Sequence, residues 1–218
     1  MNQDCRIIKC AALACAIAAS ALPGVASADE SEWAVRLGVT QLTPANKSDS
    51  FTALNLNFPA DAVHVSKKTL PEFDIFYSFS PNIVAELVLT VPQRHTVTLG
   101  GPTQGAELGY FKELPPTLLA QYHFLPGTQF DPYAGAGLNF TWINPVHLSV
   151  AGTTLDLKKS SFGPAVQLGV DSNIDKTWFV NLDFKYILLR TDVSAGGTKL
   201  TTARVDPTLV SLGVGYRF

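Results

Sequence analysis

Apolar and polar residues alternate with a period of two along most of the chain. In the segment 178–190, for example, Val180, Leu182 and Phe184 alternate with Asn181 and Asp183. Such alternation is typical of a β-strand that has one apolar face and one polar face. The pattern predicts eight strands, at residues 33–43, 70–79, 83–90, 116–124, 131–144, 161–173, 178–190 and 205–218.

The predicted connections are alternately long and short. The short ones carry turn-forming residues such as Pro81 and Gly127, whereas the first connection, residues 44–69, is long. Alternation alone also fits a soluble sandwich, but short turns on one side and long loops on the other are typical of outer-membrane barrels. Trp33 and Trp178 lie near predicted periplasmic strand ends, as in an interfacial aromatic girdle. The sequence therefore predicts an all-β, eight-stranded antiparallel transmembrane β-barrel.

The first residues have the features of an export signal. Arg6 and Lys9 precede an apolar stretch at residues 10–22, and the small residues 26–28 form a cleavage pattern. A lipoprotein signal ending at Cys15 would leave too short an apolar stretch after Lys9. We therefore expect residues 1–28 to be a cleaved signal peptide and residues 29–218 to form the barrel.

Removal of that segment changes the composition in two ways. Cys5, Cys10 and Cys15 all lie within it, so the mature chain needs no disulfide and has no thiol chemistry. Two of the 16 basic residues and one of the 18 acidic residues are also lost, which leaves a net charge of about −3. This weak acidity argues against a nucleic-acid partner.

Several segments, taken in order, resemble the OmpW/AlkL family of outer-membrane proteins. The resemblance implies an eight-stranded barrel in the outer membrane of a Gram-negative bacterium, with a narrow apolar lumen and a role in uptake of small hydrophobic molecules. The matching segments are residues 92–95, 114–124, 130–140, 167–171, 204–207 and 215–218.

Two groups of residues share the inward face. Inward glycines either relieve crowding in a narrow barrel or leave space for a ligand, and both interpretations stay open. Inward charged residues must be paired or hydrated, so we expect an ion-pair network that plugs the periplasmic half. The glycines are Gly38, Gly135, Gly137, Gly163, Gly169, Gly213 and Gly215, and the charged residues are Arg36, Glu72, Asp74, Glu86, Asp183, Lys185 and Arg217.

Apolar residues are candidates for the lining of a ligand path. The resemblance implies that Val88 points inward. Lys185 stands where the family would have a large apolar residue, which argues against a simple apolar closure of the lumen. Leu119, Phe162 and Ile187 could supply apolar lining instead, depending on the register.

The long connections also carry candidate binding residues. Phe51, Leu54, Leu56 and Phe58 in the first connection either form a collecting surface for apolar ligands, or extend strands above the membrane or pack as a lid. The basic pair 158–159 in the third connection is expected to contact lipopolysaccharide phosphates or solvent.

Catalysis is not expected. The four histidines show no metal-ligand spacing, so we expect neither a metal nor a cofactor. His123 is the one histidine centred on a strand, and a lipid-modifying enzyme would need it beside a serine and an acid.

The leading hypothesis is an outer-membrane channel for passive uptake of small hydrophobic molecules, with exit through the lumen or sideways through the wall. The alternative is a structural or adhesive barrel whose external loops bind partners. Tyr216 and the terminal Phe218 resemble the signal that the barrel-assembly machinery recognises. Outer-membrane lipid and lipopolysaccharide are the other expected partners, and we expect a monomer.

Overall fold

The chain folds almost entirely into β-strands. The computed structural model describes residues 32–53, 56–103 and 105–218, so the predicted signal peptide lies outside the described residues. No helix in these ranges is long and apolar enough to cross a membrane. The eight strands that form the barrel wall are β1 (Trp33–Thr43), β6 (Lys68–Ser80), β7 (Ile83–Thr90), β10 (Thr117–His123), β11 (Phe130–Val150), β13 (Ser160–Asn173), β14 (Trp178–Ile187) and β17 (Thr208–Arg217).

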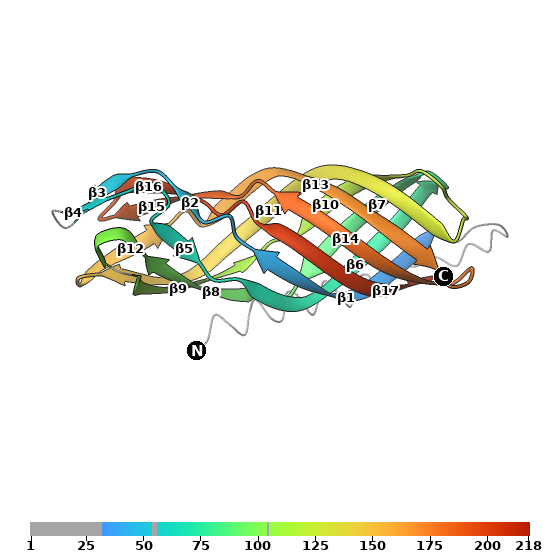
Figure 1. The fold of residues 1–218 in the computed structure, drawn as a ribbon, viewed down its shortest axis with the longest axis horizontal. Coiled ribbons are helices and arrows are strands. Elements are labelled where there is room, and N and C mark those ends of the chain that lie inside the picture. The colour runs from blue at the N-terminus through green and yellow to red at the C-terminus, as the bar shows by residue number, and fades with distance from the viewer. Residues whose placement is uncertain (1–31, 54–55, 104) are drawn as a thin grey trace. The chain divides into compact units, whose positions relative to one another are not determined.

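These strands close into a cylinder. Each one pairs antiparallel with the next in the order given, and β17 pairs with β1. Val35 on β1, for example, lies between Ile75 on β6 and Tyr216 on β17. Closure leaves no strand edge unpaired, which is what a sheet in hydrocarbon requires. The predicted eight-stranded antiparallel barrel is therefore confirmed, and Figure 1 shows its strongly tilted strands.

Outside the membrane wall, the segments predicted as long loops form further strands, which corrects the sequence-based boundaries. β11 continues to Val150 rather than ending at residue 144, and β14 ends at Ile187, with two residues between it and the start of β15. The cause is a second apolar core, because these segments also alternate and bury their apolar faces together. The external elements are β2 (Lys47–Ser48), β3 (Phe51–Ala53), β4 (Leu56–Phe58), β5 (Val63–Val65), β8 (Gln93–Leu99), η1 (Gly101–Thr103), β9 (Ala106–Leu114), β12 (Thr153–Leu157), β15 (Arg190–Ala195) and β16 (Thr198–Arg204).

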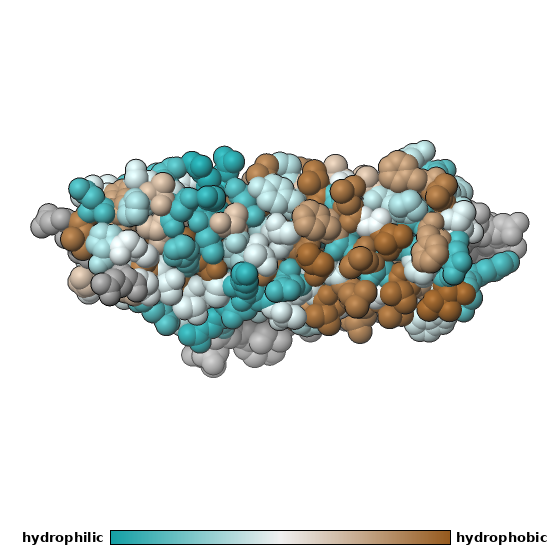
Figure 2. Space-filling model, viewed as in Figure 1, coloured by the Kyte–Doolittle hydropathy of each residue, from teal (hydrophilic) through white to brown (hydrophobic). Residues whose placement is uncertain are grey.

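The burial of side chains is inverted relative to a soluble protein. Leu37 and Phe162 are each 67% exposed on the outer face, whereas Arg36 is 1% exposed and Lys185 is 0% exposed. Figure 2 shows the outward apolar side chains as a band over the membrane-wall strands. An apolar exterior around a polar interior is typical of a β-barrel embedded in lipid.

Aromatic side chains cluster where the strands reach the short turns. The ring of Tyr216 contacts Trp178 and Phe218, with centroid distances of 4.9 and 5.2 Å. Trp33 and Tyr77 form a similar pair at 4.9 Å. These outward rings form the predicted periplasmic girdle, which anchors the barrel at the membrane interface.

The inward glycines are explained by crowding. A Cβ atom on Gly169 would overlap the ring of Tyr133, and one on Gly215 would overlap the ring of Phe179. Large side chains from neighbouring strands thus occupy the space that these two glycines leave. At these positions the structure supports the steric interpretation and leaves no room for a ligand.

Candidate functional site

The lower lumen is filled by a network of buried charges centred on Arg36. Its Nε lies 2.7 Å from Oδ2 of Asp74, and its Nη2 lies 2.7 Å from Oε1 of Glu86. Oε1 of Glu72 lies 3.5 Å from the same Nη2. The three carboxylates come from β6 and β7, so one guanidinium from β1 binds side chains of two further strands.

Lys185 on β14 holds the other side of this network. Its Nζ lies 2.6 Å from Oδ1 of Asp183 and 3.2 Å from Oε1 of Glu72. Lys185 therefore does not line a ligand path. Its ammonium group, at a position where the family resemblance implied an apolar residue, instead neutralises buried carboxylates. We name the six residues Arg36, Glu72, Asp74, Glu86, Asp183 and Lys185 the ionic plug.

Neutral side chains complete the plug. Nε2 of Gln121 and Nε2 of Gln167 donate hydrogen bonds to Oε2 of Glu86, at 2.8 and 2.7 Å. The Tyr133 hydroxyl donates to Oδ2 of Asp183 at 2.7 Å. A buried charge is tolerated only when it is paired and hydrogen-bonded. The ionic plug and these neutral partners thus form the buried network expected from the sequence and fill the lumen at this level. Arg217, which was also expected in it, lies apart and pairs with Asp171 at 3.7 Å.

His123 lies on the periplasmic side of the plug and has structural contacts. Its Nδ1 lies 2.8 Å from Oδ2 of Asp131, its Nε2 lies 3.2 Å from Oε1 of Gln121, and its ring stacks on Tyr133. None of its hydrogen bonds within the described residues involves a serine. The arrangement orients Asp131 and the end of β10.

An apolar layer lies directly above the plug. Val88, Leu119 and Ile187 are buried in it, as the sequence analysis expected for lumen-lining residues. Phe162 does not belong to it and lines no lumen, because its side chain points to the lipid side of β13. Six further members of this layer were not predicted from the sequence, namely Leu42, Leu70, Ala165, Leu189, Val205 and Leu209.

On three strands, β6, β7 and β14, the change from an apolar to a charged side chain occurs between one inward position and the next. Ile187 comes two residues after Lys185 on β14, so Lys185 is the next inward side chain towards the periplasm. The same step leads from Leu70 to Glu72 on β6 and from Val88 to Glu86 on β7. Because side chains two residues apart share a face of a strand, the layer and the plug are stacked along the axis.

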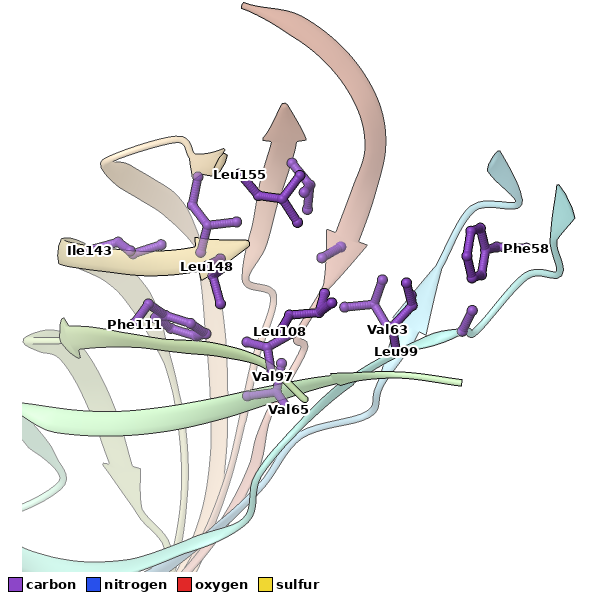
Figure 3. Close-up of a cluster of buried hydrophobic side chains, with 14 residues drawn as sticks. Phe58, Val63, Val65, Val97, Leu99, Leu108, Phe111, Ile143, Leu148 and Leu155 are labelled. Carbon is purple, nitrogen blue, oxygen red and sulfur yellow. The ribbon is translucent and has the colours of Figure 1, made fainter. Parts of the chain in front are cut away.

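Above the layer, the external hairpins enclose an apolar chamber. Its empty space amounts to about 670 Å³, counting the part open to solvent. Figure 3 shows Phe111, Leu148 and Leu155 converging on it from β9, β11 and β12. Val205 belongs to both the chamber lining and the apolar layer, so the two are continuous.

The chamber offers a ligand almost no polar group. Thr191 and Thr201 are the two polar residues in the lining. Both hydroxyls already donate to wall carbonyls, Thr201 to Asp49 at 3.0 Å and Thr191 to Lys158 at 3.4 Å. Ligand affinity would come from removing apolar surface from water, at about 25 cal/mol per Å².

The first connection contributes unevenly to this chamber. Phe51 lines it and stacks on Phe58 with a centroid distance of 4.9 Å. Leu56 is 40% exposed and does not line the chamber, which corrects its assignment to the binding surface. Leu54 lies outside the described residues. The first connection therefore forms short strands above the membrane, as one of the two interpretations expected, rather than an open collecting surface.

One seam in the chamber wall lacks a regular ladder. Between β2 and β5 the backbone amide of Val65 donates to Oδ1 of Asn46 at 2.8 Å, and that of Val63 donates to Oγ of Ser48 at 3.4 Å. A single backbone bond, from Asp61 N to Ser48 O at 2.9 Å, accompanies them. Side-chain acceptors thus replace main-chain pairing at this place.

Comparisons with known proteins agree with this architecture. The OmpW family model matches residues 29–218. The outer-membrane protein y4mB of Sinorhizobium fredii is 35% identical over all of this chain and 99% of its own length. The dibenzothiophene metabolism operon protein PahQ of Pseudomonas aeruginosa is 28% identical, over 88% of this chain and 90% of that protein.

Among solved structures, the crystal structure of the outer membrane protein OprG from Pseudomonas aeruginosa is similar. It has a TM-score of 0.75 and 27% sequence identity, over 87% of this chain and 96% of that chain. The family match over the whole predicted mature chain, the relatives named as outer-membrane proteins and the closed barrel agree. The chain therefore belongs to the OmpW family and is a β-barrel of the Gram-negative outer membrane.

Proposed function

We propose that this protein takes up small, uncharged hydrophobic molecules passively across the outer membrane. The observation that carries the proposal is the external chamber, whose lining is apolar and whose two hydroxyls are already bonded to the wall. Ligand sites are concave, mostly apolar pockets, and this one lies at the end of the barrel that faces the exterior. The name of the relative PahQ, a dibenzothiophene metabolism operon protein, is consistent with an apolar cargo.

The proposed route leaves the chamber sideways rather than along the axis. The ionic plug fills the lumen below the apolar layer, and desolvating those charges around an apolar molecule would be costly. The seam between β2 and β5 is the least regularly bonded part of the chamber wall, and Val63 and Val65 beside it line the chamber. A molecule that separates this seam reaches the outside of the barrel.

Uptake into vesicles tests the proposal. The outer leaflet should contain lipopolysaccharide, because a plain phospholipid bilayer hardly opposes an apolar solute. We expect the fluorescent tracer N-phenyl-1-naphthylamine to enter faster with the protein than without it. Equal rates with and without the protein would remove the proposal and favour the alternative of a structural or adhesive barrel.

A matched pair of variants on β12 locates the effect in the chamber. Leu155 points into the chamber, and the neighbouring Thr154 points outward. We expect Leu155→Gln to slow tracer uptake severalfold because it places an amide in an apolar pocket. Thr154→Gln adds the same group outside and should leave the rate unchanged. Folding of both variants is verified by heat-modifiable migration on a gel.

A further inference from the structure

Basic residues lie just beyond the lipid-facing band, on the external strands β8, β9, β15 and β16 and immediately before β13. Arg94 comes three residues after the exposed Val91, and Lys159 comes three residues before the exposed Phe162. Arg190 comes two residues after Leu188. Lys112 and Arg204 complete the set. We name Arg94, Lys112, Lys159, Arg190 and Arg204 the basic collar.

The collar contains like charges that face each other across the sheet. Arg94 on β8 is directly opposite Lys112 on β9. Arg190 on β15 is directly opposite Arg204 on β16. Like charges in directly opposed positions destabilise a sheet. Arg94 and Arg190, one from each pair, therefore lie in strongly positive surroundings just above the apolar band, which an anionic group in the membrane would stabilise.

Carboxylates of the chain compensate only part of the collar. Arg204 pairs with Asp49. Arg94, Lys159 and Arg190 have no carboxylate within ion-pair distance among residues 32–53, 56–103 and 105–218. The Arg94 guanidinium instead lies over the Tyr110 ring, 3.6 Å from its centroid, which holds it flat against the outer face. The whole chain has a formal net charge of −2, so this positive charge is a local concentration.

We propose that the basic collar binds the phosphate groups of lipopolysaccharide in the outer leaflet. The apolar band directly below the collar decides for a lipid over a soluble anion, because one molecule must place acyl chains beside Val91 and Phe162 and a headgroup beside Arg94 and Lys159. The two arginines, Arg94 and Arg190, can each bind a phosphate through two parallel hydrogen bonds. Figure 2 shows hydrophilic side chains gathered next to the apolar band on the visible face.

Binding of purified lipid A to the full mature chain in neutral micelles tests this inference. Native mass spectrometry measures the affinity for lipid A with both phosphates and for lipid A from which the phosphates have been removed. We expect the phosphorylated form to bind about tenfold more tightly or better. Equal affinity for both forms would overturn the proposal. Displacement of lipid A by an equal concentration of inorganic phosphate would overturn the assignment to a lipid.

Two double variants with the same change of charge locate the site. Arg94→Gln with Arg190→Gln should weaken binding of phosphorylated lipid A about tenfold. Lys176→Gln with Lys199→Gln removes two charges from the periplasmic turn and from an external hairpin, and should leave the affinity unchanged. Equal losses in both double variants, or none in the collar variant, would contradict the proposal. Arg94→Lys with Arg190→Lys keeps the charge and should retain most of the affinity.

The collar and the chamber can be separated experimentally. None of the five collar residues lines the chamber. In vesicles without lipopolysaccharide, the variant Arg94→Gln with Arg190→Gln should bind an apolar tracer as the wild type does. Loss of lipid A binding together with normal tracer binding supports the collar as a separate site, whereas loss of both would assign the effect to general unfolding and overturn the collar.

Discussion

Nη2 of Arg36 lies 2.7 Å from Oε1 of Glu86, although β1 and β7 are not hydrogen-bonded neighbours. β6 separates the two strands in the sheet, so this ion pair crosses part of the lumen. Its removal would leave buried carboxylates without their nearest cation. The ionic plug is thus held by contacts that span the barrel, in addition to the ladders between adjacent strands.

We expect Arg36→Met to destabilise the folded barrel by about 3–5 kcal/mol, because it removes the cation paired with the buried Asp74 and leaves Glu86 with Lys185 alone, at 3.9 Å. Unfolding by urea in lipid vesicles, followed by tryptophan fluorescence, measures the loss. Lys176→Gln at the exposed periplasmic turn is the control and should change the free energy of unfolding by less than about 0.5 kcal/mol. A similar small change for Arg36→Met would show that the plug is hydrated rather than dry.

The seam between β2 and β5 should open more readily than the rest of the chamber wall. Asn46 has a positive φ of 56°, so Asn46→Gly keeps the backbone conformation and removes only the Oδ1 acceptor. We expect the Val65 amide hydrogen to exchange with solvent faster in this variant, as measured by nuclear magnetic resonance. Amides of β14, which is paired on both sides, serve as the internal reference. Unchanged exchange at Val65 would mean that another contact holds the seam.

The hairpin formed by β15 and β16 should loosen in acid. The hydrogen bond from Lys199, with a second from Thr202, lowers the pKa of Asp192 below its ordinary value of 3.8. A carboxyl with a lowered pKa in the folded state stabilises that state above its ordinary pKa, and the contribution disappears as the pH falls through the lowered value. Lys199→Gln should move the pKa back up, as followed by carbon-13 titration of the carboxyl group. Lys176→Gln should leave it in place, and an unmoved pKa in Lys199→Gln would contradict the assignment.

The period-two pattern was sufficient for the membrane wall because lipid and lumen impose opposite requirements on neighbouring residues. The alternation around Val180 and Asp183 places one side chain in hydrocarbon and the next in a polar interior. The same pattern puts Phe162 on the face of Val166 and Leu168, opposite the inward Gly163, so its assignment as a lining residue went against the alternation and the structure corrects it. Strand identity follows from local sequence, whereas facing partners depend on the pairing.

The external chamber could not be predicted from the sequence for a related reason. Its walls come from segments far apart in the chain, such as Phe58, Phe111 and Val193, which are brought together only when the barrel closes. Leu155 and Val193 each sit in a short stretch rich in threonine and glycine, which reads as a loop. A signal was nevertheless present in the alternation of Val97 and Leu99 with Thr96 and Thr98.

The step from Ile187 to Lys185 has an electrical consequence. A pore that admitted apolar cargo along its axis would also offer ions and sugars a wetted path, and the cell envelope would lose selectivity. Here paired charges fill the lumen below the apolar chamber. Ions therefore find no wetted path along the axis, whereas an apolar molecule can be accommodated in the chamber above. If the proposed uptake of hydrophobic molecules holds, a membrane with many copies of this barrel would admit such molecules without becoming leaky to water-soluble compounds.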